Sequence, residues 1–163
     1  MATLADGLAL EMHRFHLRKA GFKVDGHVLT CFKTEHKEFY LLLGNPRTSP
    51  AAAPSFHLAC GIAFRGLAPR YPDRDFKNTH AWTRSEFLSP KARSDYVLTE
   101  GNRLALMEDM TAVILDISAY FSRRLEVLRD LYRTKQYDRK FLADPELRDL
   151  PGRHLPSQDG TLD

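Results

Sequence analysis

The segment from Glu11 to Gly44 constrains the fold of this chain more than any other part of the sequence. Its first part is basic, carries Met12 and Phe15 at helical spacing after Leu8, and stops at Gly21, a residue suited to the left-handed position after a helix. Strand-type side chains follow from Phe22 to Phe32, with an Asp25-Gly26 turn signal among them, and again from Phe39 to Leu43. A helix that leads directly into strands predicts an α+β domain.

Two further strand-like regions follow, each after a polar, proline-containing loop (44–54 and 66–80). The run from Phe56 to Phe64 predicts a third strand whose core face holds the following residues: Phe56, Leu58, Ile62 and Phe64. Gly61 interrupts this strand and predicts a bulge or a close approach of another backbone. Trp82 and Phe87 are expected on a fourth strand or a short helix.

The strongest helical pattern of the chain lies between Asn102 and Gln136, where neither Gly nor Pro occurs and apolar residues recur at steps of three and four. Asn102 is a candidate N-cap. An unbroken helix of this length would be roughly 50 Å long, comparable to the width of the domain or beyond it. We therefore expect a break between Ser118 and Arg124, or a projecting end.

Together these segments predict an α+β fold: an N-terminal helix, an antiparallel sheet of three to five strands, and a long C-terminal helix or helical pair packed on one face. A length of 163 residues favours one domain, which we place at residues 1–143, followed by a peripheral polar tail at 144–163. The sequence has no run of about 18 apolar residues and its start lacks a basic leader. We therefore expect a cytoplasmic protein with no membrane partner.

The sequence contains no recognisable catalytic or metal-binding motif. Cys31 and Cys60 fall in strand-like segments and are expected as buried free thiols, and the seven histidines show no metal-ligand spacing, so neither a metal nor a cofactor is predicted. The acidic pair Asp73 and Asp75 and the nearby Lys77 lie within one loop, whereas a metal-dependent nuclease places its carboxylates on separate strands. An enzyme with an unfamiliar site stays open, and a cleft uniting His57, His80 and Asp75 would favour it.

The clearest asymmetry is electrostatic. The first half of the long helix is acidic, whereas its second half and continuation are basic, and the net charge of the chain is +3. This pattern fits a solvated helix face with cations near its C-terminus, or a surface for an acidic protein or a nucleic acid. The candidate partner-binding residues are those of this basic half together with two from the 66–80 loop: Arg123, Arg124, Arg129, Arg133, Lys135, Arg139, Arg74 and Asp75.

Two segments carry a family resemblance. The run 17–23, LRKAGFK, is followed by Gly26 and by the aromatic strand residue Phe32, and the later run 56–62 reads FHLACGI. In these residues the chain resembles the bacterial family called domain of unknown function 4304, over roughly Glu11 to Phe64. The resemblance implies a helix ending in a glycine turn, then an antiparallel sheet and helices. It implies no established activity and no functional residues.

The absence of motifs in a well-formed domain favours a non-enzymatic protein-interaction module. Small α+β domains of this style occur as immunity proteins that neutralise bacterial toxins, an analogy of size and style that gives the hypothesis its most concrete form. The alternative is a nucleic-acid-binding protein that uses the basic half of the C-terminal helix.

Overall fold

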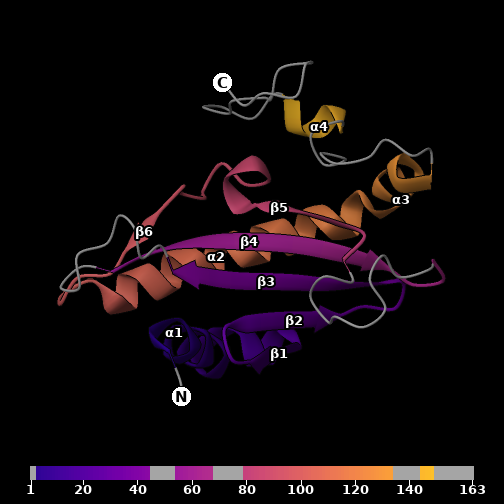
Figure 1. The fold of residues 1–163 in the computed structure, drawn as a ribbon. Helices are drawn as coiled ribbons and strands as arrows, with labels where there is room; N and C mark the ends of the chain where they lie inside the picture. Colours follow the sequence, from indigo (N-terminus) through magenta and orange to yellow (C-terminus); the bar gives the residue numbers. More distant parts are fainter. Residues whose placement is uncertain (1–2, 45–53, 68–78, 134–143, 149–163) are drawn as a thin grey trace.

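A helical segment, a six-stranded antiparallel sheet and a second helical segment follow one another along the chain (Figure 1). The computed structural model describes residues 3–44, 54–67, 79–133 and 144–148. The helices are α1 (Leu4–Met12), α2 (Arg103–Arg123), α3 (Leu125–Arg133) and α4 (Pro145–Arg148), and the short turns are η1 (His13–Leu17), η2 (Arg18–Ala20) and η4 (Ser85–Phe87). The strands are β1 (Phe22–Asp25), β2 (Val28–Phe32), β3 (His36–Gly44), β4 (Ser55–Phe64), β5 (Ala81–Arg84) and β6 (Tyr96–Val97). The predicted α+β fold is confirmed.

The N-terminal helical segment ends at Gly21, which has a φ of 87°, as the glycine signal predicted. Phe15, expected on the apolar face, is instead 59% exposed. The reason is η1, a π-helical turn, because its wider turn shifts the stripe that Leu8 and Met12 begin. Leu17, five residues after Met12, takes the buried position.

The strands form an antiparallel meander in the order β1-β2-β3-β4-β5, and the short strand β6 pairs with β4. The five strands of the meander match the upper limit of the predicted three to five strands. The sixth strand, β6, has only two residues, which is too short for a recognisable sequence pattern. The predicted Asp25-Gly26 turn joins β1 to β2. Cys31 and Cys60 lie on β2 and β4, which β3 separates, and both are buried free thiols as predicted.

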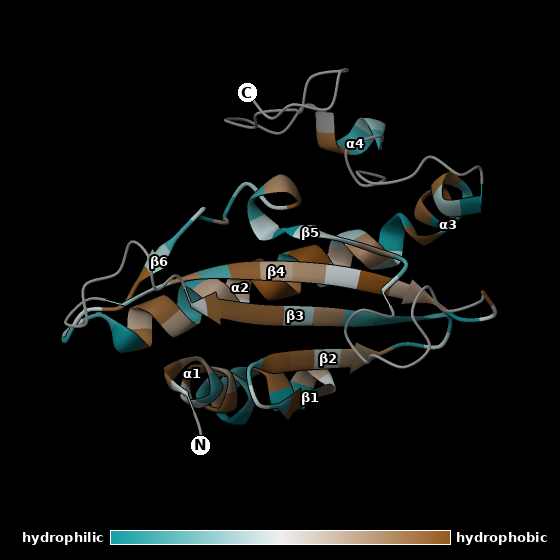
Figure 2. Cartoon of the chain, in the orientation of Figure 1, coloured by the Kyte–Doolittle hydropathy of each residue, from teal (hydrophilic) through white to brown (hydrophobic). Residues whose placement is uncertain are grey.

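The sheet has one face covered by helices, which we call the inner face, and a second, outer face. The helices α1 and α2 share a hydrophobic cluster with inner residues of all six strands, and α2 runs behind the sheet in Figure 1. The predicted core residues of β4 all belong to this cluster. Phe39, Leu41 and Ala59 form a separate buried cluster on the outer face. Figure 2 shows the corresponding hydrophobic colouring along β3 and β4.

The long helical pattern breaks at Arg124, within the predicted window, and yields α2 and α3. Asn102 precedes α2, but its side chain does not cap the helix. Its Oδ1 accepts a hydrogen bond from the Thr99 N–H at 2.7 Å, and its Nδ2 donates to the Val97 carbonyl at 2.8 Å. Among the helices of the described ranges, none is long and apolar enough to cross a bilayer.

The predicted close approach at Gly61 is confirmed and gives a stability prediction. A Cβ at this position would lie 2.8 Å from Thr79 Cγ2 and 3.1 Å from both the Ala81 oxygen and Trp82 Cβ. We expect Gly61→Ala to lower the free energy of unfolding by about 1–3 kcal/mol, because the neighbouring chain must move. Urea denaturation measures this difference.

The matched control is Gly44→Ala, also in a strand, whose added Cβ meets no heavy atom of the described residues within 4 Å. This change should stay within about 0.5 kcal/mol of the wild type. Equal effects of the two substitutions would contradict the packing account of Gly61.

Candidate functional site

A buried polar chain runs along the inner face of β3. The Glu38 side chain is fully enclosed and accepts a hydrogen bond from the Tyr40 hydroxyl at 2.8 Å, while its other oxygen lies 2.6 Å from His36 Nε2. Burial raises the pKa of Tyr40 well above its ordinary value, and the adjacent Glu38 carboxylate adds to the effect. Because all three side chains are buried, a substrate cannot reach them without opening the core. This group is structural.

The two described histidines proposed for an unfamiliar enzyme site, His57 and His80, do not meet. His57 and Phe64 lie near opposite ends of β4, roughly 20 Å apart along the strand. His80 stacks on Phe64 on the inner face, and its Nδ1 accepts the Phe64 N–H at 2.8 Å, whereas His57 pairs with Leu43 on the outer face. Asp75 lies outside the described residues. In the part of the chain that the structure describes, no group of three or more His, Cys, Asp or Glu side chains could hold a metal ion.

A second buried carboxylate, Asp144, anchors the segment that begins the predicted polar tail. Tyr120 donates to it at 2.8 Å, and Arg124 donates twice, at 2.7 and 3.0 Å. Burial acts to raise the pKa of Asp144, but the hydrogen bonds from Arg124 and Tyr120 outweigh it and hold that pKa below its ordinary value. Leu147 joins the core cluster, so residues 144–148 are packed on the domain. Residues 149–163 lie outside the described ranges.

The structure places the predicted cationic residues in ion pairs within the chain. Arg123 bonds Glu146 at 2.7 Å, and Arg124 pairs with Asp144 as described above. Arg129, only 12% exposed in its side chain, bonds Glu126 at 2.9 Å, and Arg133 lies 3.9 Å from Asp130. The remaining candidates fall outside the described residues: Arg74, Asp75, Lys135 and Arg139. The described part of the basic half is therefore largely neutralised by its own carboxylates.

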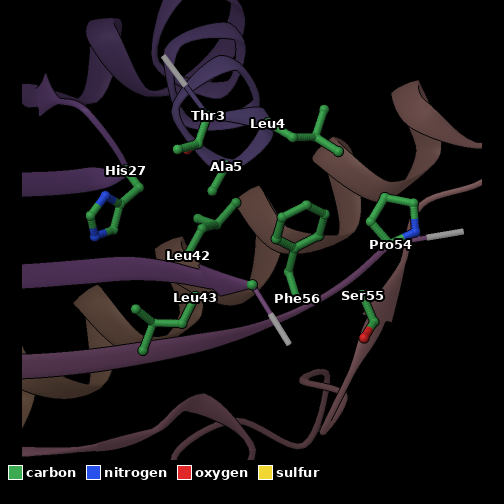
Figure 3. Close-up of a pocket in the computed structure, with 10 residues that line it drawn as sticks. Thr3, Leu4, Ala5, His27, Leu42, Leu43, Pro54, Ser55 and Phe56 are labelled. Carbon is green, nitrogen blue, oxygen red and sulfur yellow. The ribbon is translucent and has the colours of Figure 1, made fainter. Parts of the chain in front are cut away.

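A pocket of about 380 Å³ lies between the start of α1 and the ends of β3 and β4 (Figure 3). Leu42, Ala5 and Phe56 lie at its centre, and the His27 ring lies at its edge, 3.5 Å from the Asp6 carboxylate. A ligand site normally adds a few convergent polar groups to such an apolar lining. Figure 3 shows the Ser55 hydroxyl turned away from the centre, and Thr3, Gly44 and Pro54 border segments outside the described residues. Among the described residues that line it, the pocket offers no reactive pair of side chains.

The outer face of the sheet carries two strongly exposed aromatic residues. In antiparallel pairs, residues directly opposite one another share a face. By this rule Phe32 lies on the outer face beside Lys37, and Trp82 lies on it beside Gly61 and Phe39. Phe32 is 54% exposed and Trp82 is 63% exposed.

Two lysines flank Phe32. The Nζ atoms of Lys23 and Lys37 lie 5.0 and 4.6 Å from the centre of its ring, and Lys37 also lies 4.7 Å from the Phe39 ring. Within the described ranges, no carboxylate forms a salt bridge with either lysine. We call Lys23, Phe32, Lys37 and Trp82 the outer aromatic face; its aromatic members, three strand spacings apart, are separated by about 14 Å across the sheet. One protein partner can span that distance.

Sequence reasoning missed both the outer aromatic face and the buried carboxylates. The alternation of His36, Glu38 and Tyr40 with Lys37 and Phe39 was a signal, because period two places the polar groups on one face of a strand. No family model matches this sequence, and neither a curated protein nor a solved structure shows significant similarity to it.

The Asp144 anchor gives a prediction with a defined pH window. We expect Asp144→Asn to lower the free energy of unfolding at pH 7 by about 1–3 kcal/mol, because the charged partner of Arg124 and Tyr120 is lost. A lowered native pKa contributes stability above the unfolded value, near 3.8, and that contribution disappears as the pH falls through the native pKa. The difference between wild type and variant should therefore shrink below pH 3.8, as followed by urea denaturation across pH.

Asp109→Asn is the matched control, because Asp109 forms an exposed ion pair with Arg93. Its effect should be about 0.5 kcal/mol or less. If Asp144→Asn were as stable as the wild type at pH 7, the anchoring role would be wrong.

Proposed function

We propose that this chain is a non-enzymatic protein-interaction module that binds its partner through the outer aromatic face. The observation that carries the proposal is the exposure of Trp82 and Phe32 on one side of the sheet. Tryptophan is among the residues that most often dominate binding energy, since it buries a large rigid surface at a low cost in side-chain entropy. An exposed tryptophan therefore contributes a large favourable free energy when a protein partner covers it.

The charges of this face favour an acidic partner. Lys23 and Lys37 point their ammonium groups at Phe32 and form no salt bridge among the described residues. Carboxylates around an apolar patch would complement them, raise the association rate and orient the complex. A nucleic acid could also stack on aromatic residues flanked by lysines. We favour protein because the described residues beside Phe32 offer two lysines, whereas affinity for a nucleic acid depends mainly on several cations that neutralise its phosphates.

The enclosure of the reactive groups also supports a binding role. Glu38, Asp144 and both cysteines are buried. Burial raises the pKa of the Cys60 thiol far above its ordinary value, which disfavours the nucleophilic thiolate. Binding a partner through the outer aromatic face requires none of these reactive side chains.

The most specific form of the proposal is neutralisation of a bacterial toxin whose active site this chain occludes. Occlusion needs an interface of about 1,200–2,000 Å² and no chemistry of its own. The lysines of the outer aromatic face favour a toxin with an acidic rim. A toxin with a strongly cationic active site fits this face less well.

The experiment is differential capture. The wild-type chain, Trp82→Ala and Phe32→Ala are immobilised and exposed to lysate of the source cells, and retained proteins are identified and titrated by calorimetry. We expect Trp82→Ala to weaken the partner by about 30-fold or more and Phe32→Ala by roughly tenfold, because each removes a large apolar contact.

The matched control is Phe15→Ala. Phe15 is also a half-exposed phenylalanine beside a cation, Arg14, but it lies on the helical segment at the inner side of the sheet. Its removal should change affinity less than twofold. A partner lost equally with all three variants would argue against the outer aromatic face. Retention of nuclease-sensitive RNA or DNA in place of protein would overturn the protein proposal in favour of the nucleic-acid alternative.

A further inference from the structure

The helix α2 exposes an apolar stripe on the side turned away from the core. Leu104 is 62% exposed and Leu115 is 43% exposed, and the alanines between and beyond them are also exposed. At 3.6 residues per turn the positions of the stripe span about three-tenths of the helix circumference. Its members are Leu104, Ala105, Glu108, Ala112, Leu115, Ala119 and Ser122.

The stripe has the spacing of a helix-pairing seam. Ala105, Ala112 and Ala119 recur every seven residues, and Glu108 and Leu115 lie three residues after the first two of them. This is the a and d pattern of a coiled-coil face. Small side chains at one of the two positions let a second helix approach closely, near the 8 Å lower end of helix separations.

Contacts on both sides of α2 hold this stripe outward. Toward α1, Arg103 binds Glu11 with two hydrogen bonds at 2.7 and 3.0 Å. On the opposite side, the Ser89 hydroxyl donates to Asp116 at 2.6 Å. Glu108, within the stripe, forms no salt bridge with any cation of the described ranges. Because burying an unpaired charge is costly, a helix that pairs with this seam must bring a cation to Glu108.

We propose that α2 pairs antiparallel with α2 of a second copy of this chain, about a two-fold axis. A parallel pair would place Glu108 against Glu108 of the second copy, and these like charges would repel. In the antiparallel register, Ala112 faces Leu115 of the second copy and Glu108 lies beside its Ala119. Arg123 of that copy is then about one helical turn away, within reach of the Glu108 carboxylate. Two-fold symmetry makes both ion pairs at once.

The size of the seam predicts a weak dimer. The 21 residues of α2 span about 31 Å, and a single helix face buries less than the roughly 1,200 Å² of a stable interface. We therefore expect a dissociation constant on the order of tens of micromolar. This seam lies on the far side of the sheet from the outer aromatic face, so the two surfaces are independent.

Sedimentation equilibrium from about 5 to 500 μM tests the dimer directly. We expect a monomer–dimer equilibrium that Leu115→Glu weakens about tenfold or more, because a charge then enters the apolar seam. The control is Leu10→Glu, which places the same change at another exposed helical leucine, 56% exposed on α1. A wild-type chain that stays monomeric throughout, or equal effects of the two substitutions, would overturn the proposal.

A charge exchange tests the antiparallel register. Glu108→Arg alone and Arg123→Glu alone should each weaken self-association, because each homodimer then sets like charges against one another. An equal mixture of the two variants should form a heterodimer with both ion pairs present, one with reversed signs and the other with the original signs. Circular dichroism of each variant confirms folding, because Arg123 also bonds Glu146 within its own chain. A mixture that associates no better than either variant alone contradicts the register. Capture through Trp82 is read separately, so failure here leaves that proposal standing.

Discussion

The burial of the Glu38 carboxylate is the constraint on which the rest of this fold depends. A buried charge is tolerated only when its hydrogen bonds are satisfied, and Glu38 finds its partners two residues away on either side, in His36 and Tyr40. The Ser118 side chain of α2 counteracts part of the rise in the pKa of Tyr40, so the strand and the helix that covers it interact at this hydroxyl.

This arrangement also fixes the register of the central strand. A slip of one residue would turn Lys37 and Phe39 toward α2 and expose Glu38, His36 and Tyr40. Because β4 pairs with β3 and β5 pairs with β4, the register of β3 determines which side chains of those strands face α2. The side assigned to Phe32 and Trp82 therefore follows from where Glu38 is buried. The chain encloses Glu38, Asp144 and both cysteines. The two surfaces proposed for binding, the outer aromatic face and the exposed stripe of α2, lie on opposite sides of the sheet.

Local rules predicted much of this fold from sequence. The glycine stop at Gly21, the Asp25-Gly26 turn and the close approach at Gly61 are short-range features, and each is confirmed. The length of the helical pattern predicted either a break near Arg124 or a projecting end, and the structure has the break. The prediction that Phe15 is buried was wrong because a π-helical turn, which no sequence signal marks, shifts the apolar stripe. The prediction that Asn102 caps the helix was wrong because its side chain instead accepts a hydrogen bond from Thr99 in the preceding turn.

The candidate site was harder to predict, because it depends on contacts between distant segments. The cations of the C-terminal helix form a run in the sequence and were predicted to bind a partner. In the structure, however, Arg124 pairs with Asp144, which lies twenty residues later in the chain. The exposure of Trp82 depends on which face of β5 it occupies, and that face is set by pairing with β4. Hydrophobic residues are expected inside, so no sequence rule singled Trp82 out as exposed.

Trp82 is the one tryptophan of the chain, and this makes its fluorescence the most direct test of the central claim. Acrylamide, a neutral quencher unaffected by the neighbouring lysines, should quench it readily in the free protein. Once the captured partner is bound at saturation, the quenching constant should fall several-fold and the emission should shift to shorter wavelength, since the indole loses contact with water. Quenching that is unchanged in the saturated complex would contradict a partner bound on the outer aromatic face.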